Sequence, residues 1–243
     1  INRKLYVDYF FVFGGSSAIF YKKYIKCGKF INLGSFRNNK LRLNNSKKNK
    51  GILFIPNFRL HHFKNSKKNY NVESRILKTI NFFCTKNKIN LYIASSSIKN
   101  HMIEKKYYFS ELIEPKNVKF IKREKRFSNY LLIDKFDTIV FVDSTLGYEA
   151  IGRGKKIVAI SCRKNNNKII NPFGYPMIKK NKDFYFTNYD SEKEILRVLN
   201  NVYFLSNREW NKKYYNKLKD IMDYNKNNKK LNVVIDRILK QAS

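Results

Sequence analysis

The stretch "FVDSTLGYEAIGRGKKIVAIS", residues 141–161, contains every signal of one strand-helix-strand step. The apolar residues up to Val142 predict a buried strand. Ser144 and Thr145 follow at its carboxyl end, where such residues commonly begin a helix. Gly152 and Gly154 predict the end of that helix, and the apolar run after them predicts a second buried strand.

The same alternation continues along most of the 243 residues, 43% of which are hydrophobic, which is ample for a packed core. Helical spacing of Ile76, Leu77, Ile80 and Phe83 marks one amphipathic helix. We predict strands over residues 5–13, 29–36, 51–58, 89–96, 118–124, 137–143 and 155–161. We predict helices over residues 18–26, 72–87, 100–113, 127–136 and 144–154. The alternation predicts an α/β fold with a doubly wound parallel sheet covered on both faces.

The composition also suggests how the chain is divided. Residues 1–37 read as one β-α-β unit, and residues 38–50 are polar, rich in Asn and Lys, and read as a linker. Residues 51–190 read as a second α/β domain, followed by helices over residues 191–243, where Ser191 and Glu194 have the spacing of a capping box. Because the chain begins at Ile1 and its first residues resemble the middle of a fold, we expect a fragment of a longer protein.

The chain carries 51 Lys and Arg against 18 Asp and Glu, a formal net charge of +33. Such a balance is typical of nucleic-acid-binding proteins, which would gather these residues on one face. However, Lys is abundant together with Asn, Ile, Phe and Tyr, all of which have A/T-rich codons. Base composition and solvated lysines therefore explain most of the excess, and we expect no nucleic-acid partner. The scarcity of acidic residues leaves room for contact with an anionic membrane or a phosphorylated substrate.

Few residues suggest metal or redox chemistry. Cys27, Cys84 and Cys162 lie far apart, which suits a reducing cytosol. His61 and His62 fall in a predicted loop, and these residues show no three-ligand spacing, so we expect no metal and no cofactor. No apolar run is long enough to span a bilayer and no signal peptide is visible, so we expect a cytoplasmic protein with at most peripheral membrane contact.

The carboxyl end of the strand before Ser144 is the natural place for a ligand. Open parallel sheets bind ligands at this edge, and free N–H groups at a helix N-terminus attract anions. Gly147 would permit either close approach of a ligand or packing of helix on strand, and the Glu149 carboxylate could accept hydrogen bonds from ribose hydroxyls. The same residues also fit a helix cap and a solvated carboxylate, so the residues alone leave both interpretations open.

A resemblance to a known family favours the ligand site. Residues 141–161 resemble the donor-binding segment of GT-B glycosyltransferases, and among these the bacterial surface carbohydrate biosynthesis proteins, which carry a D-S-T-L-G-Y-E-A-x-x-R-G-K-K stretch. Other pieces resemble the same family in the same order: "VDYFFVFGG" (7–15), "NLGSFRNN" (32–39), "ILFIPNFR" (52–59), "NPFGYP" (171–176) and "DFYFTNYDSEKEILRVL" (183–199).

The resemblance implies two Rossmann-like domains that face a cleft, with most of the N-terminal, acceptor-side domain absent here. It implies a nucleotide-sugar-dependent transferase of surface polysaccharide assembly, whose partners are a nucleotide sugar and a glycan or lipid-linked acceptor. Ser144, Thr145 and Leu146 would bind the donor diphosphate without a metal, and Glu149 would bind the ribose. The catalytic base would come from the N-terminal domain and stays unknown.

Further residues are candidates for lining the cleft, each with a plainer alternative. Arg59 ends the strand 51–58 and could contact a phosphate, or it could be one surface cation among many. Ser95, Ser96 and Ser97 could line the cleft or form a polar turn. Within residues 171–176, Phe173 and Tyr175 could pack near the base or belong to a structural turn. Gly147 completes the predicted cleft residues.

The scaffold itself admits other activities. Nucleotide-sugar 2-epimerases and polyol-phosphate polymerases have a similar donor segment, and the absent N-terminal residues would distinguish them. A non-catalytic family member is a further alternative. The sequence leaves open the donor sugar, its base, the acceptor and the anomeric outcome.

Overall fold

The structure is a computed structural model that describes residues 5–44, 49–58, 67–112, 115–125, 127–162, 164–165, 168–169, 172–175 and 177–242. Its main feature is a seven-stranded sheet with the order β10-β11-β7-β6-β3-β4-β5. The strands are β3 (Asn49–Ile55), β4 (Leu91–Ala94), β5 (Val118–Ile121), β6 (Phe136–Val142), β7 (Lys156–Ile160), β10 (Lys182–Asp183) and β11 (Phe186–Thr187). All neighbours pair in parallel except β10 with β11. The predicted α/β fold with a parallel sheet is confirmed.

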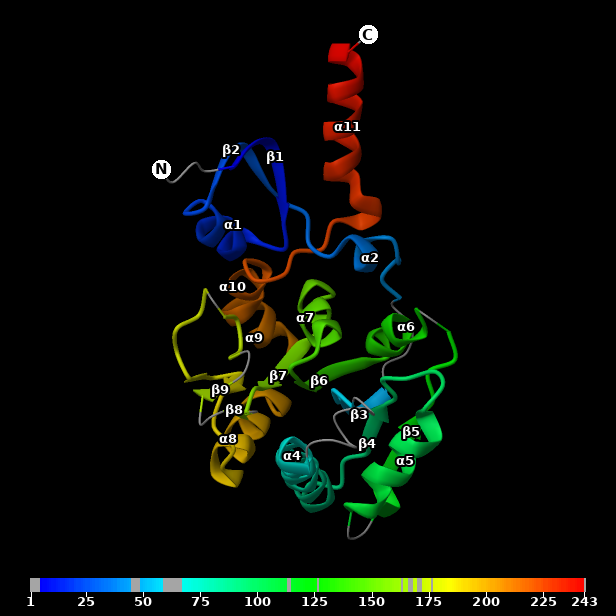
Figure 1. Ribbon diagram of the computed structural model, residues 1–243. Helices are drawn as coiled ribbons and strands as arrows, with labels where there is room; N and C mark the ends of the chain where they lie inside the picture. The colour runs from blue at the N-terminus through cyan, green and yellow to red at the C-terminus, as the bar shows by residue number, and fades with distance from the viewer. Residues whose placement is uncertain are drawn as a thin grey trace.

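Helices cover both faces of this sheet (Figure 1). Helices α4 (Lys67–Lys86) and α8 (Glu192–Tyr203) pack side by side on one face, and α7 (Thr145–Gly152), α9 (Asn207–Trp210) and α10 (Asn216–Lys219) lie on the other. Helices α5 (His101–Ser110) and α6 (Ser128–Asp134) complete the crossovers. Because both faces are covered, β6 and β7 contain unbroken apolar runs, residues 139–142 and 157–160, rather than an alternation of apolar and polar residues.

The face of α4 that the sequence predicts to be buried is buried. Ile76, Leu77, Ile80 and Phe83 all lie in the core beneath the sheet. Tertiary packing of this kind supplies most of a helix's stability, which explains why the apolar spacing located α4 correctly. Ser191 caps α8 as predicted, since its hydroxyl accepts from Glu194 N, but the Glu194 carboxylate binds Arg197 instead of closing the box.

A smaller unit precedes the main sheet. Strands β1 (Leu5–Val12) and β2 (Ile25–Asn32) pair in parallel and are joined by α1 (Gly15–Tyr21). The short helix α2 (Phe36–Asn39) follows, with Ser35 as its N-cap. Asn38 and Asn39, the first residues of the predicted linker, are buried in this helix, and β3 already begins at Asn49. The predicted linker, residues 38–50, therefore begins inside helix α2 and ends inside strand β3.

The C-terminal segment returns to this first unit. After η2 (Asn211–Tyr215) and α10, the Asp223 N–H donates to Phe13 O over 2.8 Å, and Tyr224 forms a β-bridge with Gly34. Gly34 has φ of +79°, and a Cβ there would lie 2.0 Å from Asp223 O, so only glycine allows this approach. The chain ends in η3 (Lys226–Asn228) and α11 (Lys229–Ala242), which stands beside β1 and β2 (Figure 1).

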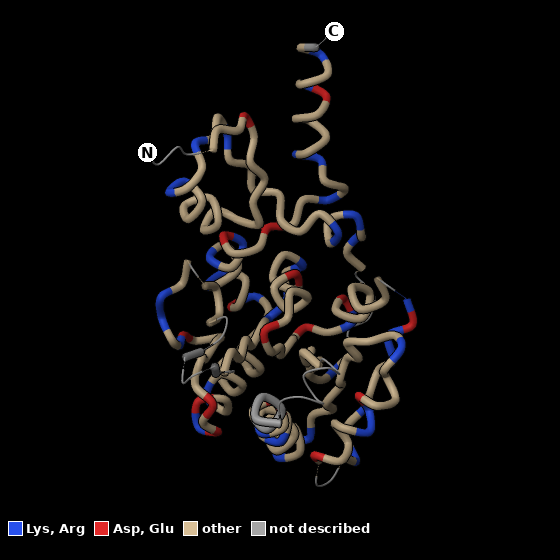
Figure 2. Tube along the Cα trace, viewed as in Figure 1, with Lys and Arg blue, Asp and Glu red and all other residues tan. Residues whose placement is uncertain are grey.

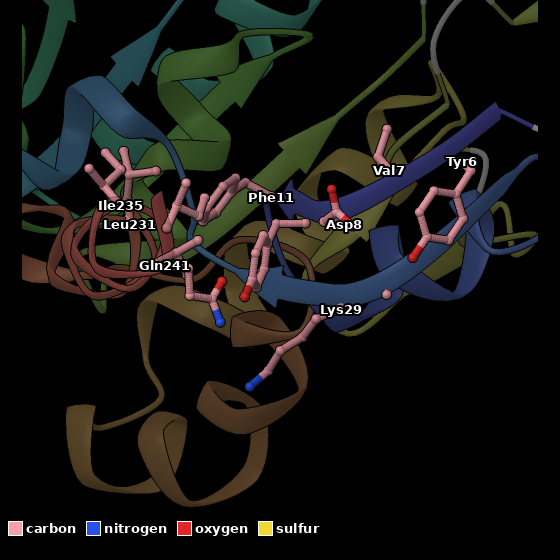
Figure 3. Close-up of a pocket in the computed structure, with 12 residues that line it drawn as sticks. Tyr6, Val7, Asp8, Phe11, Lys29, Leu231, Ile235 and Gln241 are labelled. Carbon is pink, nitrogen blue, oxygen red and sulfur yellow. The ribbon is translucent and has the colours of Figure 1, made fainter. Parts of the chain in front are cut away.

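A groove of about 940 Å³ lies between β1, β2 and α11. Figure 3 shows side chains of Tyr6, Val7 and Phe11 on the strand side and Leu231 and Ile235 on α11. No residue of α7 lines it. This groove is therefore a feature of the two terminal segments and is distinct from the predicted ligand site.

Charge is spread widely over the described chain. Figure 2 shows Lys and Arg on elements all around the outline of the molecule rather than gathered on one side. This distribution favours the base-composition explanation of the net charge over a dedicated nucleic-acid face. Among the described residues, no helix is both long and apolar enough to cross a membrane.

Candidate functional site

The loops that follow β3 and β6 meet at the point where the strand order reverses. From β3 the chain continues to β4 and β5 on one side, and then crosses to β6 and β7 on the other. Asn57, after β3, donates from Nδ2 to the Asp143 carbonyl, after β6, over 3.3 Å. In open α/β sheets ligands bind in the crevice outside the carboxyl ends of the strands at such a switch point.

The turn between β6 and α7 exposes the first backbone groups of the helix. Asp143 adopts φ of +46°, a left-handed conformation that is uncommon for a non-glycine residue and lets the chain turn sharply after the strand. Ser144 is the N-cap, but its side chain makes no capping hydrogen bond. The N–H groups of Gly147 and Tyr148 bond to the Ser144 carbonyl, whereas those of Thr145 and Leu146 have no acceptor among the described residues. These two groups are available to an anion.

A cavity of about 300 Å³ lies beside this turn. Three segments of the chain build it: α2, the region from β5 to α6, and α7. Its lining residues are Arg37, Arg123, Phe127, Asn129, Tyr130, Thr145, Leu146 and Glu149. Thr145, Leu146 and Glu149 were predicted as site residues, whereas Arg37 and Arg123 were not. Arg37 lies within residues 32–39, one of the stretches that resemble the family, and this resemblance was the signal that could have indicated it as a site residue.

Glu149 is a buried carboxylate in the wall of this cavity. Its Oε1 accepts a hydrogen bond from the Ser35 hydroxyl, and its Oε2 accepts one from the Tyr130 hydroxyl over 2.8 Å. Burial raises the pKa of Glu149, and the two hydroxyl hydrogen bonds partly offset that rise. Each carboxylate oxygen can accept a second hydrogen bond, so Glu149 can still receive a ligand hydroxyl.

The later residues of the motif serve the structure. Buried Arg153 donates from Nε to Asp134 Oδ1 and from Nη1 to Asn38 Oδ1, both over 2.8 Å. Lys155 Nζ donates to the Asp134 carbonyl over 3.0 Å at the end of α6, and Lys156 Nζ donates to the carbonyl of Tyr203, the last residue of α8, and to that of Leu205. Cations at helix C-termini satisfy the last carbonyls and complement the dipole.

Gly147 serves packing rather than ligand approach. A Cβ at this position would lie 2.1 Å from Cγ of the Phe141 ring on β6. Gly147 is buried and does not line the described cavity, in contrast to its predicted place in the cleft. Its absent side chain lets α7 lie directly on β6, which brings the first turn of the helix to the edge of the sheet.

Phe173 is a core residue, and the prediction that it lines the cleft is wrong. Its side chain is fully buried and stacks on Tyr148, with ring centroids 5.3 Å apart and planes at 7°. It also contacts Phe141 and Phe186. Tyr175 is 69% exposed and does not line the described cavity. The apolar ring of Phe173 is buried because the loop folds over α7, while its neighbours Asn171 and Pro176 lie outside the described residues.

Ser95 to Ser97 form a polar turn around a buried carboxylate. The Ser95 hydroxyl donates to Glu104 Oε2 over 2.7 Å, and the Ser96 N–H donates to Glu104 Oε1 over 3.0 Å. The Ser96 hydroxyl donates to a backbone carbonyl, and its own carbonyl accepts from Arg123 Nη1 over 3.0 Å. None of the three serines lines the cavity, so the turn supports the site through Arg123 and through Asn129, whose Nδ2 donates to the Ser95 carbonyl over 3.1 Å.

Arg59, which was predicted as a phosphate contact, lies outside the described residues, as do the loop residues His61 and His62. His101 begins α5, and its Nδ1 lies 3.1 Å from the Ile98 carbonyl. Within the described ranges, no three His, Cys, Asp or Glu residues come together in a way that could hold a metal ion.

Solved structures share this fold. They include the UDP-GlcNAc 2-epimerase from Methanocaldococcus jannaschii, with 10% identity and a TM-score of 0.55 over 91% of this chain and 59% of that chain. The S. aureus MnaA-UDP co-structure has 13% identity and a TM-score of 0.54 over 96% and 60%. The GtfA/B complex has 11% identity and a TM-score of 0.53 over 97% and 45%. The chain thus spans between 45% and 60% of the length of these structures.

No curated protein matches the chain in sequence. One family, described as "putative O-antigen biosynthesis protein", matches residues 1–239, which is nearly the whole chain. This match confirms the resemblance to surface carbohydrate biosynthesis proteins at the level of the family. The chain belongs to this family of O-antigen biosynthesis proteins.

Proposed function

We propose that the chain is part of a glycosyltransferase that builds a surface polysaccharide, with its nucleotide-sugar donor bound at the first turn of α7. One observation carries this proposal. The open N–H groups of Thr145 and Leu146 and the carboxylate of Glu149 lie at one cavity of about 300 Å³, at the switch point of a parallel sheet. This arrangement offers donors for phosphates beside an acceptor for hydroxyls.

The chemistry of glycosyl transfer suits this arrangement. The bond between the anomeric carbon and the diphosphate oxygen breaks, and negative charge develops on the leaving nucleoside diphosphate. N–H groups fixed at a helix N-terminus stabilise such charge because they are already oriented when it develops. In this proposal the Ser144 and Thr145 hydroxyls add further donors, and the chain's own groups hold the diphosphate without a metal.

Glu149 would bind the ribose of the donor. It lies four residues after Thr145, about one turn or 6 Å along the helix axis, so it lines the same cavity as the first turn of α7. Its carboxylate would accept from ribose hydroxyls with the lone pairs that Ser35 and Tyr130 leave open. In this proposal the acceptor is a glycan or a lipid-linked sugar at the cytoplasmic face of a membrane.

A 2-epimerase or a polyol-phosphate transferase is a rival activity for the same cavity. The M. jannaschii 2-epimerase shares the fold, and a donor site of this kind would serve each reaction. Product analysis with the full-length protein distinguishes them. A transferase forms no new product from the nucleotide sugar alone, whereas an epimerase converts that sugar without any acceptor.

Hydrogen exchange tests the donor site directly. The chain is incubated with UDP, GDP, CDP, ADP and dTDP in turn, and with their common sugar derivatives. We expect at least one nucleotide to protect the amides of residues 143–149, while α11 exchanges as before. If none of them slows exchange at residues 143–149, the donor site is not where we place it.

A further inference from the structure

Arg37 is a cationic residue at the cavity, and its side chain has no partner among the described residues. It lies on α2 and lines the cavity together with Thr145 and Glu149. Its guanidinium makes no hydrogen bond or ion pair with any described residue. Its charge nevertheless reaches the site: burial raises the pKa of both Glu149 and Tyr130, and the positive charge of Arg37 opposes that rise at each of them.

The backbone on both sides of Arg37 is anchored to α7. Ser35 donates from its hydroxyl to Glu149, and Asn38 donates from Nδ2 to the Glu149 carbonyl over 3.1 Å. Arg153 Nη1 in turn donates to Asn38 Oδ1 over 2.8 Å. Because its neighbours are fixed in this way, Arg37 is held at the mouth of the cavity while its long side chain keeps its donors available.

We propose that Arg37 is a donor-binding residue whose guanidinium pairs with a phosphate of the nucleoside diphosphate at the α7 N-terminus; this rests on the proposed function. A guanidinium binds two phosphate oxygens at once, which gives both charge compensation and orientation. Arg123 also lines the cavity but already donates to the Ser96 carbonyl over 3.0 Å. Arg37 is thus the arginine with a full set of donors for the ligand.

This assignment makes the segment before β3 part of the donor site. Arg37 comes from the chain between the β1-α1-β2 unit and the main sheet, whereas Thr145 and Glu149 come from the main sheet's own helix. A bound diphosphate would therefore bridge the two parts of the molecule. It would select ligands by phosphate content, because a nucleoside without phosphates gains nothing from Arg37.

The test compares Arg37→Gln with Arg42→Gln. Arg42 lies on the same segment, its side chain is exposed, and its carbonyl accepts from Arg153, which is its one polar contact with the described residues. Calorimetry measures the affinity of each variant for UDP, GDP, CDP, ADP and dTDP, and for the nucleoside of the tightest binder. We expect Arg37→Gln to lose roughly tenfold or more in affinity for the diphosphate, as for one charged hydrogen-bonded pair, and to keep its affinity for the nucleoside. Arg42→Gln should change neither, and Arg37→Lys should recover part of the loss.

The outcomes separate the two proposals. If a nucleoside diphosphate binds and Arg37→Gln leaves its affinity unchanged, the role of Arg37 is overturned and the donor site stands. An equal loss for diphosphate and nucleoside also overturns it, since a structural defect would act on both. If the unmodified chain binds none of the five diphosphates, the proposed function and the role of Arg37 fail together.

Discussion

The Ser35 hydroxyl donates a hydrogen bond to Glu149 across 114 positions of the sequence. This contact joins the segment before β3 to the motif helix at the cavity itself. Arg153, the C-cap residue of α7, makes a second connection to Asn38 and to the carbonyls of residues 41 and 42. The motif therefore has two roles. Its first residues line the cavity, and Arg153 holds the segment around α2, which forms another wall of that cavity.

Replacing Glu149 by Gln should change how stability depends on pH. Because burial raises the pKa of Glu149, its contribution to stability is complete below the ordinary carboxyl pKa and is lost as the pH rises through the raised value. Glu149→Gln removes that loss, so the variant should gain stability relative to the unmodified chain as the pH rises above the ordinary carboxyl pKa of about 4.3. Urea unfolding at several pH values measures this.

Glu111 serves as the control, because its pKa is shifted in the opposite direction to that of Glu149. A hydrogen bond from the Ser74 hydroxyl, first among the causes, lowers the pKa of Glu111. Its contribution is therefore present above the ordinary carboxyl pKa and is lost as the pH falls. Glu111→Gln should therefore be less stable than the unmodified chain above the ordinary carboxyl pKa, and this difference should shrink as the pH falls below it, whereas the gain of Glu149→Gln grows as the pH rises above it. Curves that change with pH in the same way for the two variants would contradict the assignment.

Arg153→Met should be strongly destabilising. It removes the guanidinium that donates to both carboxylate oxygens of Asp134, and this loss falls on a buried carboxylate. We expect a loss of about 3–5 kcal/mol in the free energy of unfolding. The exposed pair of Arg75 and Asp190 is the matched control, and Arg75→Met should cost less than about 1 kcal/mol. Similar losses in the two variants would argue against a structural role for the Arg153 network.

Gly147→Ala should destabilise the chain by overpacking. The new methyl group would collide with the Phe141 ring, and such insertions cost about 1–3 kcal/mol. Adding Phe141→Leu should recover part of this loss, because the two positions share one contact. Gly15→Ala is a milder control, since a Cβ there first meets a side-chain oxygen of Asp220 at 3.1 Å. A double variant with additive losses would show that Phe141 is not the cause.

Phe173 and Tyr175 should respond very differently to alanine. Phe173 is fully buried among aromatic rings, so Phe173→Ala should cost about 3–5 kcal/mol in thermal or denaturant unfolding. Tyr175 is mainly exposed, and Tyr175→Ala should stay within about 0.5 kcal/mol. A small effect of Phe173→Ala on stability would contradict the assignment of this ring to the core.

Ser144→Ala should leave stability nearly unchanged while weakening nucleotide binding. The Ser144 side chain makes no capping bond, so its loss should cost no more than about 0.5 kcal/mol. Ser191 does cap α8, and Ser191→Ala should cost about 1 kcal/mol and leave nucleotide affinity intact. Calorimetric titration with the nucleoside diphosphates, beside unfolding curves, measures both effects; a purely structural Ser144 would reverse the pattern.

Short-range patterns located most of the elements. The apolar run of β6, the spacing of Ile76 and Phe83 in α4, and the glycines at the end of α7 depend on residues a few positions apart, and the structure bears them out. The same signals could not assign Phe173, because an apolar ring in a Pro- and Gly-rich loop fits either a cleft or a core. Ser206 and Glu209 form a complete capping box that was not predicted, although its spacing was visible in the sequence.

The sequence by itself determined the α/β alternation, the motif at the end of β6 and the family to which that motif points. Only the tertiary structure decided that β3 and β6 are neighbours at the switch point, that Gly147 packs on Phe141, and that Arg37 reaches the cavity of Glu149. The physical reason is range. Helix and strand periodicities are written within a few residues, whereas strand order and the hydrogen bond from Ser35 to Glu149 depend on how distant segments pack together.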